Sequence, residues 1–305
     1  MAVSMDISAI VDLLEIDAAD VTVPLNDLKA AIEAMQAIAG TPVQVCDGRL
    51  TLTSGTAVTT GDVTAATTIY FTPYSGNRIA IYDGSNWVTY SFTEKSLSLS
   101  GLAASTPYDV FGYISAGALA LEAVAWTNDT TRATALVLQD GVLCKSGTLT
   151  KRYLGTFRTT STIGQTEDSI SKRFVYNHYN QKRRRLYLTE TTSHSYTTQA
   201  WRAWNNSTAN RVEFIQGVLE HDINVTVQGA WGTTAVAGVG AALNSTTTPN
   251  LGSDAYVYDT GNTGQYKSSS KDVMPILGYQ YIQGMEIGNT SITFTQINLT
   301  ATVMG

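Results

Sequence analysis

The chain has 305 residues, and its 44 threonines equal in number all of its Lys, Arg, Asp and Glu residues together. Charged residues make up only 14%, where about a quarter is usual, whereas the 43% hydrophobic content is ordinary and excludes wholesale disorder. Threonine suits pleated, half-exposed surfaces, so the composition predicts a mainly β protein. The sequence has no apolar run of about 18 residues and no secretory signal, so we expect no membrane insertion.

Residues 1–40 differ from the rest because apolar side chains recur there at helical spacing. Pro24 and Gly40 bound the second of two apolar stripes, as is usual at the start and end of a helix. We therefore predict a short N-terminal α-helical segment. Its candidate partner-binding or oligomer-binding residues are Ile7, Ile10, Leu14, Leu25, Leu28, Ile32 and Met35.

The same segment is strongly acidic. It contains seven Asp or Glu residues against one base, Lys29, so its net charge of −6 equals that of the whole chain. Two short helices cannot bury enough surface to be stable alone. The stripes must pack on the β-body, on copies of themselves or on a partner protein.

From residue 41 the hydrophobic pattern has a period of two. Residues 78–92 form two alternating runs around Asp83 and Gly84, which predicts a β-hairpin. Further strands are predicted at residues 67–72, 108–114, 119–126 and 133–138. Turn signals recur at intervals of about ten residues, which favours antiparallel β-sandwich or jelly-roll-like domains. We predict three parts, a helical segment at 1–40, a β-domain at 41–165 and a second β-sandwich domain at 166–305 with a basic leading segment.

Residues 151–190 are basic, with nine Lys or Arg residues against three acids. Lys182, Arg183, Arg184 and Arg185 lie near several aromatic residues, a combination that also occurs in nucleic-acid-binding surfaces. The chain as a whole is acidic, with a pI of about 5.0, and would be repelled by a polyanion outside this segment. We therefore expect the four residues to contact acidic protein, such as the N-terminal segment of the same or a neighbouring subunit, and not nucleic acid.

The last third again alternates as strands do, apart from a polar stretch at 244–271 that we expect to be an exposed loop. Strands are predicted at residues 185–190, 200–204, 211–218, 223–229, 234–243, 280–286 and 291–303.

No catalytic or metal-binding motif stands out. The triplet Glu220, His221 and Asp222 is interpreted as a polar turn, because in an extended chain its side chains would point to opposite faces. Cys46 and Cys144 have no metal-site spacing and are interpreted as free thiols. Trp87, close to the hairpin turn, could be exposed. We expect no enzyme activity, no cofactor and no metal.

Four runs of the sequence are distinctive, namely residues 50–87 (LTLTSGTAVTTGDVTAATTIYFTPYSGNRIAIYDGSNW), 107–114 (PYDVFGYI), 124–160 (VAWTNDTTRATALVLQDGVLCKSGTLTKRYLGTFRTT) and 166–180 (TEDSISKRFVYNHYN). These runs resemble proteins of tailed bacteriophages and prophages that are described as virion structural, tail or fibre-like proteins. The resemblance covers about residues 42–230, and the C-terminal third matches more loosely.

This resemblance implies a non-enzymatic β-rich building block, present in many copies on the virion and assembled in the host cytoplasm. We expect a tail-associated or tail-fibre component that is attached through its N-terminal helices to other virion proteins. A homo-oligomer is expected, and a trimer by analogy with fibres. Two alternatives remain open, a capsid decoration or head-fibre protein and a receptor protein that binds a host surface glycan.

Overall fold

The computed structural model describes residues 44–232, 237–251, 256–259, 266–274, 276–288 and 292–305. The predicted N-terminal helices, and with them the seven candidate contact residues between Ile7 and Met35, lie outside these ranges. Residues 43–305 form one compact unit. In its described part the regular elements of the chain are β-strands and one short 3₁₀ turn, η1, at Trp204–Asn206.

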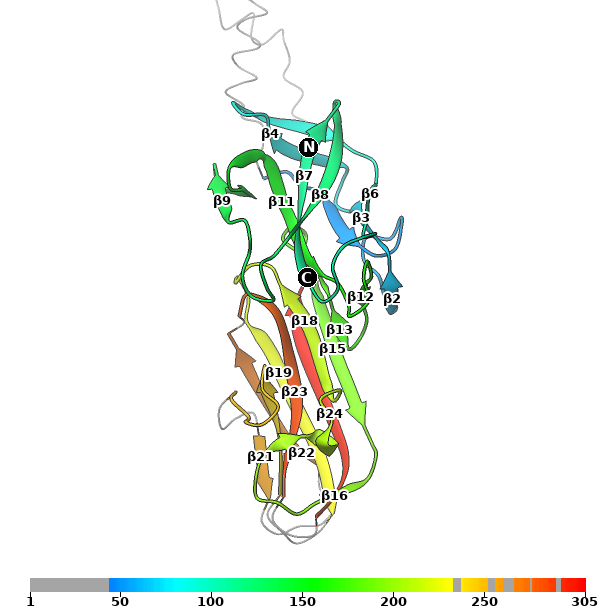
Figure 1. Cartoon of the computed structure of the whole chain (residues 1–305), viewed down its shortest axis with the longest axis vertical. Coiled ribbons are helices and arrows are strands. Elements are labelled where there is room, and N and C mark those ends of the chain that lie inside the picture. Colours follow the sequence, from blue (N-terminus) through cyan, green and yellow to red (C-terminus); the bar gives the residue numbers. More distant parts are fainter. Residues whose placement is uncertain (1–43, 233–236, 252–255, 260–265, 275, 289–291) are drawn as a thin grey trace, which may run out of the picture. The chain divides into compact units, whose positions relative to one another are not determined.

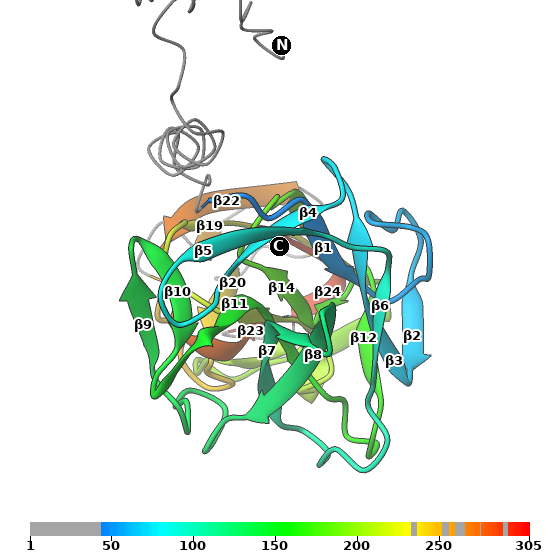
Figure 2. The same ribbon diagram turned by 90° about the horizontal axis from the view of Figure 1, so that it is seen from above.

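The first half of this unit contains two small sheets and one larger sheet (Figures 1 and 2). The small sheets are β1 (Gly48–Thr51), β3 (Thr68–Pro73) and β6 (Lys95–Ser98) in the order β1-β3-β6, and the hairpin β4 (Arg78–Tyr82) with β5 (Trp87–Ser91). The larger sheet has the order β8-β7-β11-β10-β9, with β14 also paired to β11. Its strands are β7 (Pro107–Ser115), β8 (Ala118–Ala125), β9 (Leu136–Gln139), β10 (Val142–Lys145), β11 (Thr148–Arg158) and β14 (Val175–Asn177).

The hairpin predicted at residues 78–92 is confirmed. Tyr82 pairs with Trp87, and the Asp83 carboxylate closes the turn by accepting hydrogen bonds from the backbone N–H groups of Ser85 and Asn86 at 2.8 and 2.7 Å. Gly84 has φ +112°, a conformation that other residues rarely adopt. Asp83 and Gly84, the residues that predicted the hairpin, therefore also stabilise its turn.

The second half is a sandwich of two sheets. One has the order β2-β12-β13-β18-β23-β20-β21, with β17 also on β23, and the other has the order β15-β24-β19-β22, with β16 on β24. The first contains β2 (Val63–Ala66), β12 (Thr166–Asp168), β13 (Lys172–Arg173), β17 (Arg202–Ala203), β18 (Arg211–Gln216), β20 (Ala237–Leu243), β21 (Tyr256–Asp259) and β23 (Gly278–Ile287). The second contains β15 (Arg183–Glu190), β16 (His194–Tyr196), β19 (Ile223–Gly232), β22 (Tyr266–Val273) and β24 (Ile292–Met304).

Alternation along the strands builds the core of this sandwich. Buried and less buried residues alternate through most of β24, and its inward side chains include Phe294, Leu299 and Val303. They pack with Val212 and Phe214 of β18 from the other sheet. A separate core, around Ile69, Phe71 and Val110, lies in the first half of the unit.

The predicted fold class is confirmed for the described residues, which form antiparallel sheets except that β13 and β18 pair in parallel. The division at residue 165 stays a prediction. Strand pairing crosses it, since β11 pairs with β14 and β2 pairs with β12.

Two local predictions were wrong in part. The stretch 244–271 contains β21 and most of β22, which pairs with β19 from Ile223 to Ala230. In the stretch 200–204, only Arg202 and Ala203 are in a strand, after which the chain turns into η1. Within the described ranges, no helix has the length and apolar character needed to cross a membrane.

Candidate functional site: a polar cleft beside the basic segment

The charges of the basic segment 151–190 are largely engaged within the chain. Arg152 is fully buried and donates to the carbonyl oxygens of Val45 and Ala80 at 2.9 and 2.8 Å. Lys151 and Lys145 both bind Glu122. Most of these cations therefore stabilise the fold and do not form a free basic surface.

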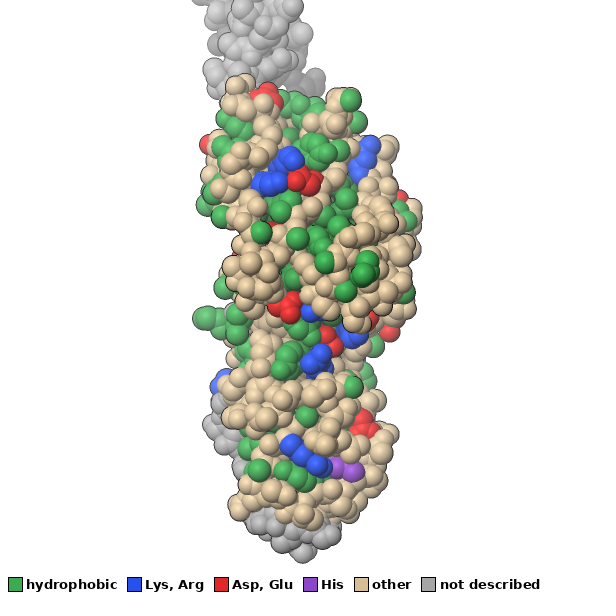
Figure 3. Space-filling view, in the orientation of Figure 1, with side chains coloured by type: hydrophobic (Ala, Val, Ile, Leu, Met, Phe, Trp, Pro, Cys, Tyr) green, Lys and Arg blue, Asp and Glu red, His purple; other side chains and the backbone are tan. Residues whose placement is uncertain are grey.

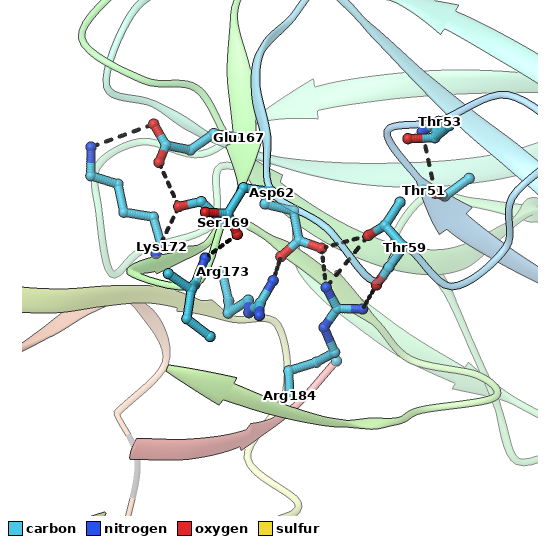
Figure 4. A network of polar contacts seen from close by, with 12 residues as sticks. Thr51, Thr53, Thr59, Asp62, Glu167, Ser169, Lys172, Arg173 and Arg184 are labelled. Carbon is cyan, nitrogen blue, oxygen red and sulfur yellow. Dashed lines mark hydrogen bonds and ion pairs between the residues drawn. The ribbon is translucent and has the colours of Figure 1, made fainter. Parts of the chain in front are cut away.

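Asp168 binds two further arginines of this segment. It accepts hydrogen bonds from Arg173 Nη1 at 3.0 Å and from Arg184 Nη2 at 2.6 Å, and the Thr59 hydroxyl lies beside the same group (Figure 4). Burial lowers the pKa of the Arg184 guanidinium, and Asp168 opposes this shift. Arg184 thus has an internal partner.

The other three predicted contact residues are spread around it. Arg183 and Arg185 are exposed, as the alternation along β15 requires. Lys182 lies 5.0 Å from the centre of the Tyr74 ring, and Arg185 lies over the Tyr187 ring. On the face shown in Figure 3, Lys and Arg atoms occur in small separate groups, several of them next to Asp or Glu atoms. That face carries no continuous basic patch, and whether these residues contact a partner stays a prediction.

A polar cleft of about 430 Å³ lies close to this segment. Its floor begins at β12 and β13, where neighbouring residues point to opposite faces of the sheet. Asp168 pairs in register with Arg173, whereas Glu167 and Lys172 turn into the cleft and form an ion pair of 3.4 Å. Alternation therefore places Asp168 and Arg173 on one face and turns Glu167 and Lys172 towards the cleft. Figure 4 shows Glu167 paired with Lys172, apart from Arg173 and Arg184.

The floor continues on β18 and β23. Lys172 is aligned with Glu213 in the parallel β13–β18 pairing, which brings both onto one face. Glu213 accepts a hydrogen bond from Arg211 Nε at 3.2 Å through Oε1 and one from the Tyr279 hydroxyl at 2.5 Å through Oε2. Burial and this hydrogen bond raise the pKa of Tyr279 above its usual range, so its hydroxyl remains a donor. The result is a row of alternating carboxylates and cations across three strands.

The opposite wall comes from β2, from loops and from the end of β11. Arg158 Nε donates to Asp129 at 3.0 Å, and its guanidinium lies 3.8 Å from the centre of the Tyr279 ring. Ala65 and Ser105, with φ of 55° and 51°, hold the left-handed conformation that non-glycine residues rarely adopt. Small polar residues complete the wall, namely Thr64, Thr160, Ser161, Thr162 and Gln165.

The cleft is lined mainly by groups that donate or accept hydrogen bonds. Both oxygens of Glu213 are engaged by Arg211 and Tyr279, and Glu167 accepts from Ser169 through one oxygen and faces Lys172 with the other. The hydroxyls, amides and ion pairs are arranged to exchange hydrogen bonds with a polar ligand.

The residues considered in the sequence for chemistry lie elsewhere. Glu220, His221 and Asp222 are exposed in the turn between β18 and β19. Cys46 and Cys144 are free, as predicted, and both are buried. No group of three or more His, Cys, Asp or Glu side chains suited to a metal ion occurs in the described ranges.

A second cavity, of about 460 Å³, lies beside Leu243, Leu251 and Val273. The exposed side chains of Met274 and Ile276 border it. It adjoins positions outside the described ranges, and nothing in the described residues shows what covers it.

No family model matches the chain, and no curated protein matches it. Among solved structures, the CBM36-1 domain of a multidomain xylanase from the hindgut metagenome of Trinervitermes trinervoides aligns with 11% identity and a TM-score of 0.22, over 38% of this chain and 95% of that domain. The insecticidal delta-endotoxin Cry8Ea1 of Bacillus thuringiensis aligns with 8% identity and a TM-score of 0.26, over 78% of this chain and 49% of the toxin. The infectious bursal disease virus Gx strain structure gives 12% identity and a TM-score of 0.26, over 80% of this chain and 70% of that one. These scores are too low to transfer a function.

Proposed function

We propose that this chain is a non-enzymatic structural protein of a tailed-bacteriophage virion, a tail-associated or tail-fibre component attached through residues 1–40. The resemblance of residues 42–230 to virion proteins supports this role. The β-body supports it too, because its charged groups serve mainly to hold strands together.

The observation that carries the proposal is the distribution of charge. Residues 1–40 hold the entire net charge of −6, whereas residues 43–305 contain 18 bases and 18 acids. In that body, buried or partly buried cations such as Arg132, Arg158 and Arg184 pair with carboxylates of the same chain. A neutral, internally paired body joined to a charged segment with two apolar stripes is suited to a scaffold with one dedicated attachment segment.

Attachment would use the apolar stripes and multiple copies. Burying Leu and Ile side chains contributes about 25 cal/mol per Å² of apolar surface removed from water. Copies held together in a homo-oligomer, of which a trimer is our working model, make weak individual contacts effectively permanent. The partners are other virion proteins, and assembly takes place in the host cytoplasm.

The test is incorporation of the double variant Leu28→Asp/Ile32→Asp into particles. Two carboxylates in the second stripe should prevent its burial, so mass spectrometry of purified particles should find the variant nearly absent. A matched control, Leu219→Asp/Met274→Asp, changes two exposed apolar side chains of the body and should be incorporated normally. Normal copy number of the first variant would contradict attachment through this segment.

Copy number also separates the tail role from a capsid-decoration or head-fibre role. A shell requires hundreds of copies of a decoration protein, whereas a tail requires a few to some tens. Quantitative mass spectrometry against a known capsid protein measures this ratio in the same particles.

A further inference from the structure

We infer that the polar cleft between β12, β13, β18 and β23 binds an uncharged, hydroxyl-rich ligand, a neutral saccharide chain. This inference goes beyond the structural role proposed above, because a scaffold needs no such cleft. It rests on the charge balance of the cleft, on its hydrogen-bonding groups, on its preorganisation and on its size.

The charges of the cleft cancel locally. Lys172 faces Glu167 at 3.4 Å, Arg211 faces Glu213 at 3.2 Å, and Arg158 faces Asp129 at 3.0 Å. A charged ligand would have to compete with one partner of an existing pair. An uncharged ligand keeps all three pairs and adds hydrogen bonds to them, so the balance of charge favours a neutral ligand.

The ion pairs match the hydrogen bonding of sugar hydroxyls. A hydroxyl group donates one hydrogen bond and accepts others, so it can bridge a carboxylate and a neighbouring cation. The cleft offers such neighbours repeatedly along its floor, from Glu167 and Lys172 to Glu213 and Arg211. Hydrogen bonds to charged groups are stronger than those between neutral groups. The wall adds the hydroxyls of Thr160, Ser161 and Thr162 and the amide of Gln165.

The cleft is also preorganised. Arg158 is held by Asp129 on one side and lies over the Tyr279 ring, while Tyr279 is itself tied to Glu213. Ala65 and Ser105 both line the cleft in the left-handed conformation, which is strained for residues other than glycine. Such strain is concentrated at ligand sites more often than elsewhere, because there the fixed shape is used.

The volume of about 430 Å³ lies in the range of small-molecule sites and could accommodate part of a saccharide chain. The wall residues Ser161 and Thr162 are exposed, so the cleft opens to solvent and a longer chain could continue beyond it.

The experiment measures binding of the full chain to an array of neutral and uronic-acid-containing bacterial oligosaccharides. We expect wild-type protein to bind at least one neutral saccharide. Thr162→Trp, which fills the rim from an exposed position, should abolish that binding. Glu213→Gln removes the charged acceptor between Arg211 and Tyr279 and should weaken binding about tenfold or more.

The matched control for the rim variant is Ser85→Trp, which places the same side chain in the exposed β4–β5 turn and should bind like wild type. Thermal unfolding shows whether each variant is folded, and Thr162→Trp should melt within a few degrees of Ser85→Trp. The inference is overturned if wild type binds no neutral saccharide, if it binds only acidic ones, or if folded Thr162→Trp binds as well as wild type. None of these results depends on whether the chain is incorporated into virions.

Discussion

Arg132 and Asp109 form one of the buried ion pairs on which the β-body depends. Arg132 Nε and Nη2 donate to the two carboxylate oxygens at 2.7 and 3.2 Å, and the side chains are only 12% and 3% exposed. Arg132 also donates to the carbonyl oxygen of Gly217 and lies 4.4 Å from the centre of the Trp126 ring. One guanidinium therefore joins β7 to the segment that follows β18.

Replacing this arginine should be costly. Arg132→Met leaves Asp109 buried without its counter-ion, so we expect the free energy of unfolding to fall by about 3–5 kcal/mol. Arg78→Met is the matched control, because Arg78 is 62% exposed and lies 3.8 Å from Asp47, and it should cost under about 1 kcal/mol. Urea denaturation measures the free energy of unfolding of both variants. Equal decreases would show that burial does not determine how much these ion pairs contribute to stability.

The two cysteines predict a dependence on pH. Burial raises the pKa of Cys46 and that of Cys144 from 9.0 to about 11. As pH rises from 9 towards 11 the unfolded chain loses its thiol protons first, so the free energy of unfolding falls across this window. Both thiols should resist iodoacetamide at pH 9 in native protein and react readily in urea, as followed by mass spectrometry.

The variant Cys46→Ala/Cys144→Ala isolates the thiols from the buried tyrosines, which titrate in the same alkaline range. Its loss of stability between pH 9 and 11 should be shallower than that of wild type. Fast alkylation of the native chain at pH 9 would show that the thiols are accessible, contrary to the structure.

Single residues also show where sequence reasoning stops. Free thiols and a polar turn at Glu220, His221 and Asp222 could be predicted, because they depend only on local spacing. Exposure was considered for Trp87 because it is close to the hairpin turn. In the structure Trp87 is buried beside Cys144, and its indole N–H donates to Asp140 at 3.0 Å. That burial comes from β10, 55 residues further along, and leaves no local signal.

At the scale of elements, Gly155 allows β14 to approach β11. A Cβ atom at this position would lie 2.1 Å from the carbonyl oxygen of Tyr176, across the β11–β14 pairing. We expect Gly155→Ala to push the two strands apart and to lower the free energy of unfolding by about 1–3 kcal/mol or more.

Gly61→Ala is the control for this variant. Gly61 is exposed, and a Cβ atom there would meet nothing within 4 Å, so this change should alter stability by no more than about 0.5 kcal/mol. Thermal unfolding of both variants measures the difference. A Gly155→Ala protein as stable as wild type would mean that β14 can move without cost.

Strand length does not separate the predicted strands from the missed ones. The five-residue strands β4 and β5 were predicted, whereas the eleven-residue β11 was not. Buried and less buried residues alternate along most of β19 and β24, and these strands were predicted, as were β7 and β15. β21 and β22 were missed because the stretch 244–271 as a whole is rich in Ser, Thr, Gly and Asn and resembles a loop, whereas pairing with β20 and β19 makes these two segments strands.

The cleft could not be predicted from the sequence either. Its floor depends on β12 and β13, of three and two residues, which are too short to show a period. The sequence shows that Glu167, Asp168, Lys172 and Arg173 are charged. Only the register between β12 and β13 shows which of these side chains face the cleft. The basic composition of residues 151–190 could be predicted, whereas its engagement by internal carboxylates required the fold.

At the scale of the whole molecule, charge is separated along the chain. Residues 43–305 are formally neutral, with arginines and lysines engaged inside the body, while residues 1–40 carry the net charge of −6. This separation could be read from the sequence. It is what one expects of a scaffold that folds without its partner and is attached through one segment.

The central claim is that the chain is a virion component attached through residues 1–40. A density map of the intact virion, with the β-body fitted into it, tests this most directly. We predict that the body occupies repeated density on the tail and that residues 1–40 lie between it and another virion protein. A map of complete particles with no density for the body, or with the body attached through another surface, would contradict the account.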